Sequence, residues 1–117
     1  MKKILVIEDE PDIVAIVKIV LEEEGYIVST LPDPAEFKTV LRESKADLVL
    51  LDLNIAGFDG KIICEYIKGQ DDLKNIPIIF MSANINIKEA KEQCGADDFV
   101  PKPFDLDRLV GAVKSYI

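Results

Sequence analysis

The sequence contains no histidine, and only two of its 117 residues are cysteine. Without histidine, the chain cannot form a Ser-His-Asp or Cys-His catalytic group or a histidine-ligated metal site. Cys64 and Cys94 lie in separate helical patterns and lack the CxxC spacing of a metal or redox pair. We therefore expect two reduced thiols and a cytoplasmic location.

Long apolar runs and an excess of basic residues are also missing. No run approaches the length of a membrane-spanning helix, and the first residues do not have the pattern of a signal peptide. The formal net charge is −8, whereas binding to nucleic acid requires a basic face. We therefore expect neither membrane association nor direct nucleic-acid contact. The length suits a single domain over residues 1–117.

What the chain does contain is a regular alternation of strand and helix patterns. Each of five short apolar segments is followed by apolar residues at helical spacing, although the pattern over 86–94 is weak. This order predicts an α/β fold: a doubly wound, five-stranded parallel sheet with five helices on its two faces. The predicted strands are residues 3–7, 26–30, 47–51, 76–81 and 97–100.

Polar side chains follow four of the five predicted strands. In a sheet of this kind, ligands and reactive groups gather outside the carboxyl ends of the strands. We therefore expect these side chains to lie close together if their strands are neighbours. They are Glu8, Asp9 and Glu10 after the first strand, Asp52 after the third, Ser82 after the fourth and Lys102 after the fifth.

Several carboxylates with one lysine are electrostatically costly. Two like charges about 4 Å apart repel by about 4 kcal/mol at an effective dielectric constant of about 20. A divalent cation removes this repulsion, and a site made only of oxygen ligands suits Mg²⁺. Asp52 is then a candidate nucleophile toward a phosphoryl group.

Each of these residues also has an ordinary structural explanation. Asp52 could form a turn, and the acids at 8–10 could favour a helix N-terminus through the helix dipole. Ser82 could cap a helix, and Lys102 could be a solvated lysine. The convergence of all of them at predicted strand ends favours a functional site.

Four motifs, in this order and spacing, give the chain a family resemblance over essentially its whole length. They are VIEDEP at 6–11, LLDLNIAGFDG at 50–60, MSAN at 81–84 and GADDFVPKPF at 95–104. With these motifs the chain resembles the receiver domains of two-component response regulators. The resemblance implies a flavodoxin-like fold with sheet order 2-1-3-4-5.

The resemblance also implies a role for individual residues. Glu8 and Asp9 match the acidic pair that holds Mg²⁺, with Asp9 as the direct ligand, and the backbone carbonyl of Asn54 matches a further ligand. Asp52 matches the phosphoacceptor, which is also a metal ligand. The remaining matches are Lys102, which pairs with the phosphoryl group, Ser82 and Phe99, which switch conformation, and Pro103, whose preceding peptide bond is expected to be cis.

By the same resemblance, the phosphoryl donor is a phosphohistidine on a histidine kinase or a histidine phosphotransfer protein. Phosphorylation would reshape the surface formed by the fourth helix, fifth strand and fifth helix, with homodimerisation as one possible result. The chain would then be a signalling domain rather than an enzyme. One departure is Ala56, where the family often has proline.

Two other functions are compatible with this fold. A flavodoxin-like interaction module that is never phosphorylated would need none of the site chemistry. A small aspartyl-phosphate hydrolase would require a second acid at position 54, where this chain has Asn54. An FMN carrier is disfavoured because the acids at 8–10 would repel its phosphate. A P-loop is excluded because no GxxxxGK motif occurs.

Overall fold

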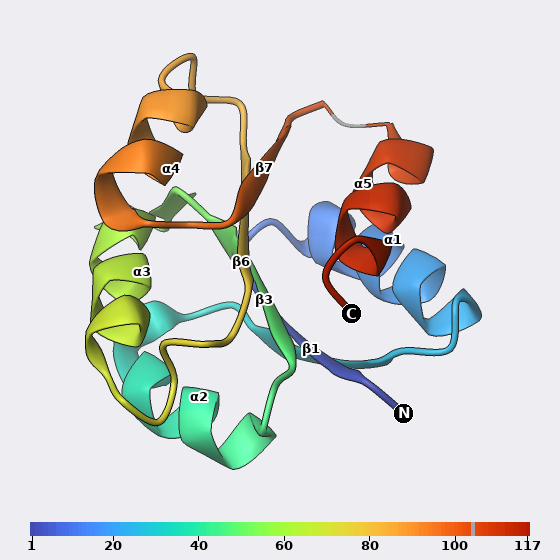
Figure 1. The fold of residues 1–117 in the computed structure, drawn as a ribbon. Coiled ribbons are helices and arrows are strands. Elements are labelled where there is room, and N and C mark those ends of the chain that lie inside the picture. The colour runs from blue at the N-terminus through green and yellow to red at the C-terminus, as the bar shows by residue number, and fades with distance from the viewer. Residues whose placement is uncertain (104) are drawn as a thin grey trace.

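The computed structural model describes residues 1–103 and 105–117. Strands and helices alternate along the chain, as the sequence predicts (Figure 1). The strands are β1 (Lys3–Ile7), β2 (Ile27–Leu31), β3 (Leu48–Asp52), β4 (Asn54–Ile55), β5 (Phe58–Asp59), β6 (Ile78–Ser82) and β7 (Asp98–Pro101). The helices are α1 (Pro11–Glu23), the short 3₁₀ helix η1 (Pro34–Glu36), α2 (Phe37–Ser44), α3 (Gly60–Gly69), α4 (Ile87–Cys94) and α5 (Leu106–Lys114).

Five strands form one parallel sheet in the order β2-β1-β3-β6-β7. Because β6 and β7 are its fourth and fifth strands along the chain, this is the predicted order 2-1-3-4-5. Helices α2, α3 and α4 pack on one face, and α1 and α5 pack on the other (Figure 1). The doubly wound, flavodoxin-like architecture with five helices is therefore confirmed.

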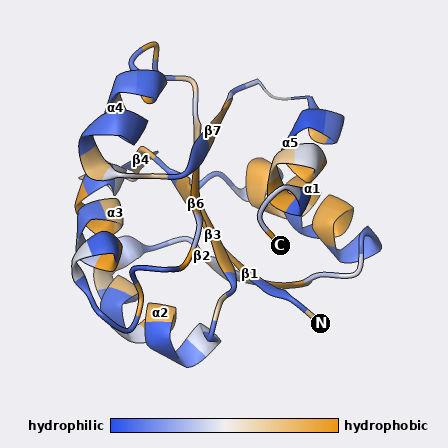
Figure 2. Cartoon of the chain, viewed as in Figure 1, coloured by the Kyte–Doolittle hydropathy of each residue, from blue (hydrophilic) through white to orange (hydrophobic). Residues whose placement is uncertain are grey.

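The central strands β3 and β6 are apolar up to their last residues, Asp52 and Ser82, because both of their faces are covered. All five residues of β3 and of β6 are buried. Helix α4 shows the complementary pattern, with a mainly hydrophilic surface, whereas α1 is hydrophobic over much of its length and leaves Ile16 and Ile19 partly exposed (Figure 2). Burial on both faces is the usual arrangement of a parallel sheet.

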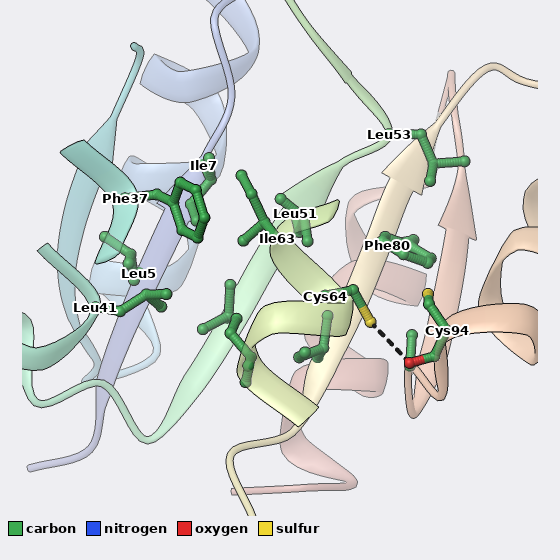
Figure 3. Packing of buried hydrophobic residues seen from close by; sticks show 14 of the residues in the cluster. Leu5, Ile7, Phe37, Leu41, Leu51, Leu53, Ile63, Cys64, Phe80 and Cys94 are labelled. Carbon is green, nitrogen blue, oxygen red and sulfur yellow. Dashed lines mark hydrogen bonds between the residues drawn. The ribbon is translucent and has the colours of Figure 1, made fainter. Parts of the chain in front are cut away.

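Each face of the sheet has its own hydrophobic core. On the face of α2, α3 and α4, the ring of Phe80 is fully buried among side chains such as Ile63 and Leu51 (Figure 3). Both cysteines lie in this core as free thiols. The Cys64 Sγ donates to the Cys94 carbonyl at 3.4 Å, joining α3 to α4, and burial raises the pKa of the Cys64 thiol well above its ordinary range.

One carboxylate holds together the edge of the sheet at which β6 and β7 begin. The Asp97 Oδ2 accepts hydrogen bonds from the Ile78 N–H at 2.8 Å and from the Lys68 Nζ at 3.0 Å. Lys68 also donates to the carbonyl of Ile76 at 3.1 Å. Asp97 therefore ties α3 to the first residues of two strands, on the side of the sheet opposite the predicted site.

The structure adds one element that the sequence patterns do not predict. Strands β4 and β5 form a two-stranded antiparallel hairpin between Asp52 and α3, in which Asn54 pairs with Asp59. Its turn contains Ala56 and Gly57, both with positive φ angles, of 51° and 85°. The five strands of the parallel sheet begin and end within one or two residues of the predicted segments.

Candidate functional site

The candidate site lies at the carboxyl edge of the sheet, where β1, β3, β6 and β7 all end. Glu8 directly follows β1, Asp52 is the last residue of β3, and Ser82 is the last residue of β6. The Lys102 N–H donates to the Ser82 carbonyl at 2.8 Å, which places Lys102 beside the end of β6. Parallel pairing therefore brings four segments that are distant in sequence to one edge.

Lys102 lies at the centre of a compact ionic cluster. Its Nζ is 2.7 Å from Glu8 Oε1, 3.3 Å from Asp52 Oδ2 and 3.8 Å from Glu10 Oε1. The Glu8 side chain is 0% exposed, and those of Lys102 and Asp52 are 9% and 7% exposed. Glu10 lies at the open side of the cluster, with 61% of its side chain exposed. The cluster is thus buried at its base and accessible from solvent at its rim.

Burial perturbs the protonation of this cluster. The pKa of Glu8 is raised from 4.5 to about 8, first by desolvation and then by the neighbouring Asp52 carboxylate, against the opposing effect of Lys102. Burial by itself would lower the pKa of Lys102. The hydrogen bond to Glu8 and the negative charge of Asp52 outweigh burial, so the pKa of Lys102 is raised. The lysine therefore stays charged, whereas a proton on Glu8 is favoured at neutral pH.

The donor set fits a divalent cation. Glu8, Glu10 and Asp52 each offer a carboxylate oxygen, and these oxygens lie within 4.8 Å of one another. The second oxygen of Glu8, Oε2, is buried and has no hydrogen-bond partner. When all three acids are ionised, Lys102 leaves two negative charges uncompensated. A cation that prefers oxygen ligands would satisfy both the unpartnered oxygen and the excess charge.

Comparison with known proteins assigns the family. A family model described as the response regulator receiver domain matches residues 4–114. The chain belongs to this family. Among curated relatives, the receiver domain is 33% identical over 116 residues to the DNA-binding response regulator MtrA of Mycolicibacterium smegmatis. That alignment covers 97% of this chain and 50% of MtrA, so the chain spans about half the length of this relative.

Solved structures agree with this assignment. The signal receiver domain of a signal transduction histidine kinase from Syntrophus aciditrophicus superposes with a TM-score of 0.89 at 32% identity, covering 99% of this chain and 89% of that one. The signal receiver domain of a DNA binding response regulator protein from Colwellia psychrerythraea gives a TM-score of 0.90 at 27% identity, covering 98% and 97%. The receiver domain is accordingly a signalling domain of two-component systems.

The predicted metal ligands of the receiver domain do not all gather in one place. Glu8 and Asp52 belong to the acid group, whereas the Asp9 carboxylate accepts a hydrogen bond from the Ala56 N–H at 3.0 Å. Asn54 lies two residues beyond Asp52, and its N–H donates to Asp52 Oδ1 at 3.3 Å. Among the described residues, Glu10 is the third member of the acid group.

The predicted switch residues occupy neighbouring strands. Ser82 is buried, and its hydroxyl accepts a hydrogen bond from the Asn84 N–H at 3.0 Å. Phe99 lies on β7, directly opposite Phe80 of β6, and packs partly buried against the core that contains α4. The peptide bond between Lys102 and Pro103 is cis, as the resemblance implies.

Two features of the site were not identified from the sequence. The sequence places Glu10 among the polar residues at the strand ends but does not single it out as a metal ligand, although it follows Glu8 by two residues and so can point to the same side. Gly60, the first residue of α3, packs directly on the backbone at the end of β3. A Cβ on Gly60 would lie far inside van der Waals distance of the Asp52 carbonyl oxygen. The LLDLNIAGFDG motif contains this glycine, so its spacing from Asp52 was the available signal.

The rest of the surface gives two further observations. A groove of about 570 Å³ runs between the β4–β5 hairpin and α4, and Asn54 and Asn84 are among the residues that line it.

Over residues 1–103 and 105–117, every helix is too short or too polar to cross a membrane.

Proposed function

We propose that this receiver domain accepts a phosphoryl group on Asp52, in a Mg²⁺-dependent transfer from a phosphohistidine on a histidine kinase or a histidine phosphotransfer protein. The observation that carries the proposal is the position of the Asp52 carboxylate. It lies 3.3 Å from the Lys102 Nζ, at the buried base of an acidic cluster that opens to solvent. Such a carboxylate can approach a phosphorus atom while the ammonium group of Lys102 stays beside it.

In this mechanism an oxygen of Asp52 forms a bond to phosphorus as the bond from phosphorus to the donor's imidazole nitrogen breaks. The products are an acyl phosphate and a neutral histidine on the partner. Lys102 holds the Asp52 carboxylate before transfer and pairs with a phosphoryl oxygen afterwards. Phosphoryl transfer depends mainly on such positioning and on neutralisation of charge.

Glu8, Asp9, Asp52 and the backbone carbonyl of Asn54 would hold Mg²⁺. When bound, Mg²⁺ supplies positive charge that offsets the charge on the phosphoryl oxygens. The chain's own carboxylates must be ionised to hold it, so the proton on Glu8 has to leave as the cation enters.

Signalling would follow from movement of Ser82 and Phe99. A phosphoryl group on Asp52 offers new acceptors for the Ser82 hydroxyl, which now accepts from the Asn84 N–H. A shift of Ser82 toward Asp52 would pull the loop between β6 and α4 and make room for Phe99 to turn inward. The surface of α4, β7 and α5 would change as a result. The domain would catalyse only its own phosphorylation and dephosphorylation.

Intact-mass measurement after incubation with acetyl phosphate and Mg²⁺ tests the assignment. We expect wild type to gain the mass of one phosphoryl group and Asp52→Asn to gain none. Asp59→Asn is a matched control in the same loop, because asparagine keeps the side-chain oxygen that caps α3 through the Lys61 N–H. Labelling of Asp52→Asn as strong as that of wild type would contradict the proposal. An interaction module that is never phosphorylated would leave all three proteins unlabelled.

A further inference from the structure

Asp9 links the loop after β1 to the hairpin that follows Asp52. Its Oδ2 accepts the hydrogen bond from the Ala56 N–H at 3.0 Å, across 47 positions of sequence. The same carboxylate is absent from the described group of acids, in which the oxygens of Glu8, Glu10 and Asp52 lie within 4.8 Å of one another. Asp9 would therefore have to turn away from Ala56 in order to join those oxygens.

The hairpin has a backbone conformation that needs outside support. Ala56 has a φ of 51°, in the left-handed region that a residue with a Cβ rarely adopts. Such a conformation persists where surrounding contacts hold it in place. On one side Ile55 is fully buried, and within the turn the Gly57 N–H donates to Asn54 Oδ1 at 3.1 Å. The hydrogen bond to Asp9 holds Ala56 itself.

We infer that the Asp9 carboxylate couples divalent-cation binding to the conformation of the β4–β5 hairpin. This inference rests on the Mg²⁺ dependence proposed above. Without the cation, Asp9 holds the Ala56 N–H and the left-handed turn. With the cation, Asp9 turns toward the acid group and releases Ala56. The hairpin begins two residues after Asp52, so the surface beside the phosphoacceptor differs between the cation-free and the cation-bound domain.

Exchange of the Ala56 amide proton with solvent, followed by NMR, measures this contact directly. In EDTA we expect the exchange to be about five- to tenfold faster in Asp9→Ala than in wild type, the size expected for one lost hydrogen bond. Ala56→Gly is the matched control, because glycine keeps the N–H and adopts a φ of 51° without strain. The backbone amide at position 56 of that variant should stay as protected as the wild-type Ala56 amide.

The same exchange measurement is then repeated in saturating Mg²⁺. Exchange at Ala56 in wild type should accelerate toward the Asp9→Ala rate, whereas Asp9→Ala itself should not change.

Two results would overturn the inference. One is equal Ala56 exchange in wild type and Asp9→Ala in EDTA. The other is a wild-type Ala56 amide that keeps its protection while Mg²⁺ shifts the amides of Leu53 and Asn54. If Mg²⁺ shifts no amide around Asp52 in any variant, the magnesium dependence of the proposed function fails together with the coupling. The EDTA comparison would still decide whether Asp9 holds the hairpin.

Discussion

Without a metal ion, the receiver domain should lose stability as the pH rises from about 5.5 to 8, because Glu8 is buried. The pKa of Glu8 is raised from 4.5 to about 8 in the folded domain, first by desolvation and then by the neighbouring Asp52. Between these two values the folded domain holds one proton that the unfolded chain has released. The contribution of this proton to the free energy of unfolding is therefore fully present at low pH, and it is lost as the pH rises through the folded-state pKa.

The size of the effect follows from the two pKa values. One bound proton changes the free energy of unfolding by up to about 1.4 kcal/mol per pH unit. Over the whole interval this gives an upper limit of about 5 kcal/mol. The value of about 8 already includes the opposing effect of Lys102, whose Nζ lies 2.7 Å from Glu8. The range from pH 5.5 to 8 covers about two-thirds of the interval between the two pKa values, so we expect about 3 kcal/mol to be lost there.

Urea denaturation in EDTA, followed by far-ultraviolet circular dichroism across this pH range, measures the loss. Glu8→Gln is the control, because glutamine has the shape of a protonated glutamate and does not titrate. Its stability should be nearly independent of pH in this range, and saturating Mg²⁺ should reduce the slope in wild type. Equal slopes for wild type and Glu8→Gln in EDTA, or a wild-type stability that rises with pH, would refute the reasoning.

Two further changes test how the fold positions the site. Gly60→Ala should lower the free energy of unfolding by about 2–3 kcal/mol, because its Cβ would collide with the Asp52 carbonyl. By contrast, the Cβ of Gly111→Ala in α5 meets nothing within 4 Å, and this variant should stabilise the domain by about 0.5–1 kcal/mol. Urea denaturation of both variants separates the steric effect at Gly60 from a general response to alanine. Asp97→Ala should cost about 2–3 kcal/mol in the same assay, since it leaves two donors at the opposite edge of the sheet without their acceptor. Asp71→Ala removes only an exposed ion pair with a 3.4 Å separation and should change stability by less than about 0.5 kcal/mol, so equal losses for Asp97→Ala and Asp71→Ala would contradict this role.

The sheet and its helices could be predicted because each element carries its own periodic signal. A segment such as Leu48–Asp52, apolar up to its last residue, indicates a strand covered on both faces, and a stripe at helical spacing after it indicates a covering helix. The alternation then leaves few arrangements of the sheet. The β4–β5 hairpin could not be predicted in this way, because its strands have two residues each.

The site was predictable to the level of which strand ends meet, and less so for individual side chains. Asp52 and Lys102 are fixed by the ends of β3 and β7, so topology alone brings them together. Asp9 and Glu10 lie just beyond β1, where the direction of each side chain depends on loop dihedral angles that no periodic pattern specifies. The structure accordingly gives Glu10 a position in the acid group and Asp9 a contact with the hairpin.

The two thiols buried between α3 and α4 have a practical consequence for studying the domain. Cys64 and Cys94 are its only cysteines, and both are shielded from solvent while these helices remain packed. A thiol reagent can reach them only when the helices separate, so the rate of alkylation reports how often α4 leaves α3. The chain thus carries a built-in chemical reporter of α4 motion that requires neither a label nor a substitution.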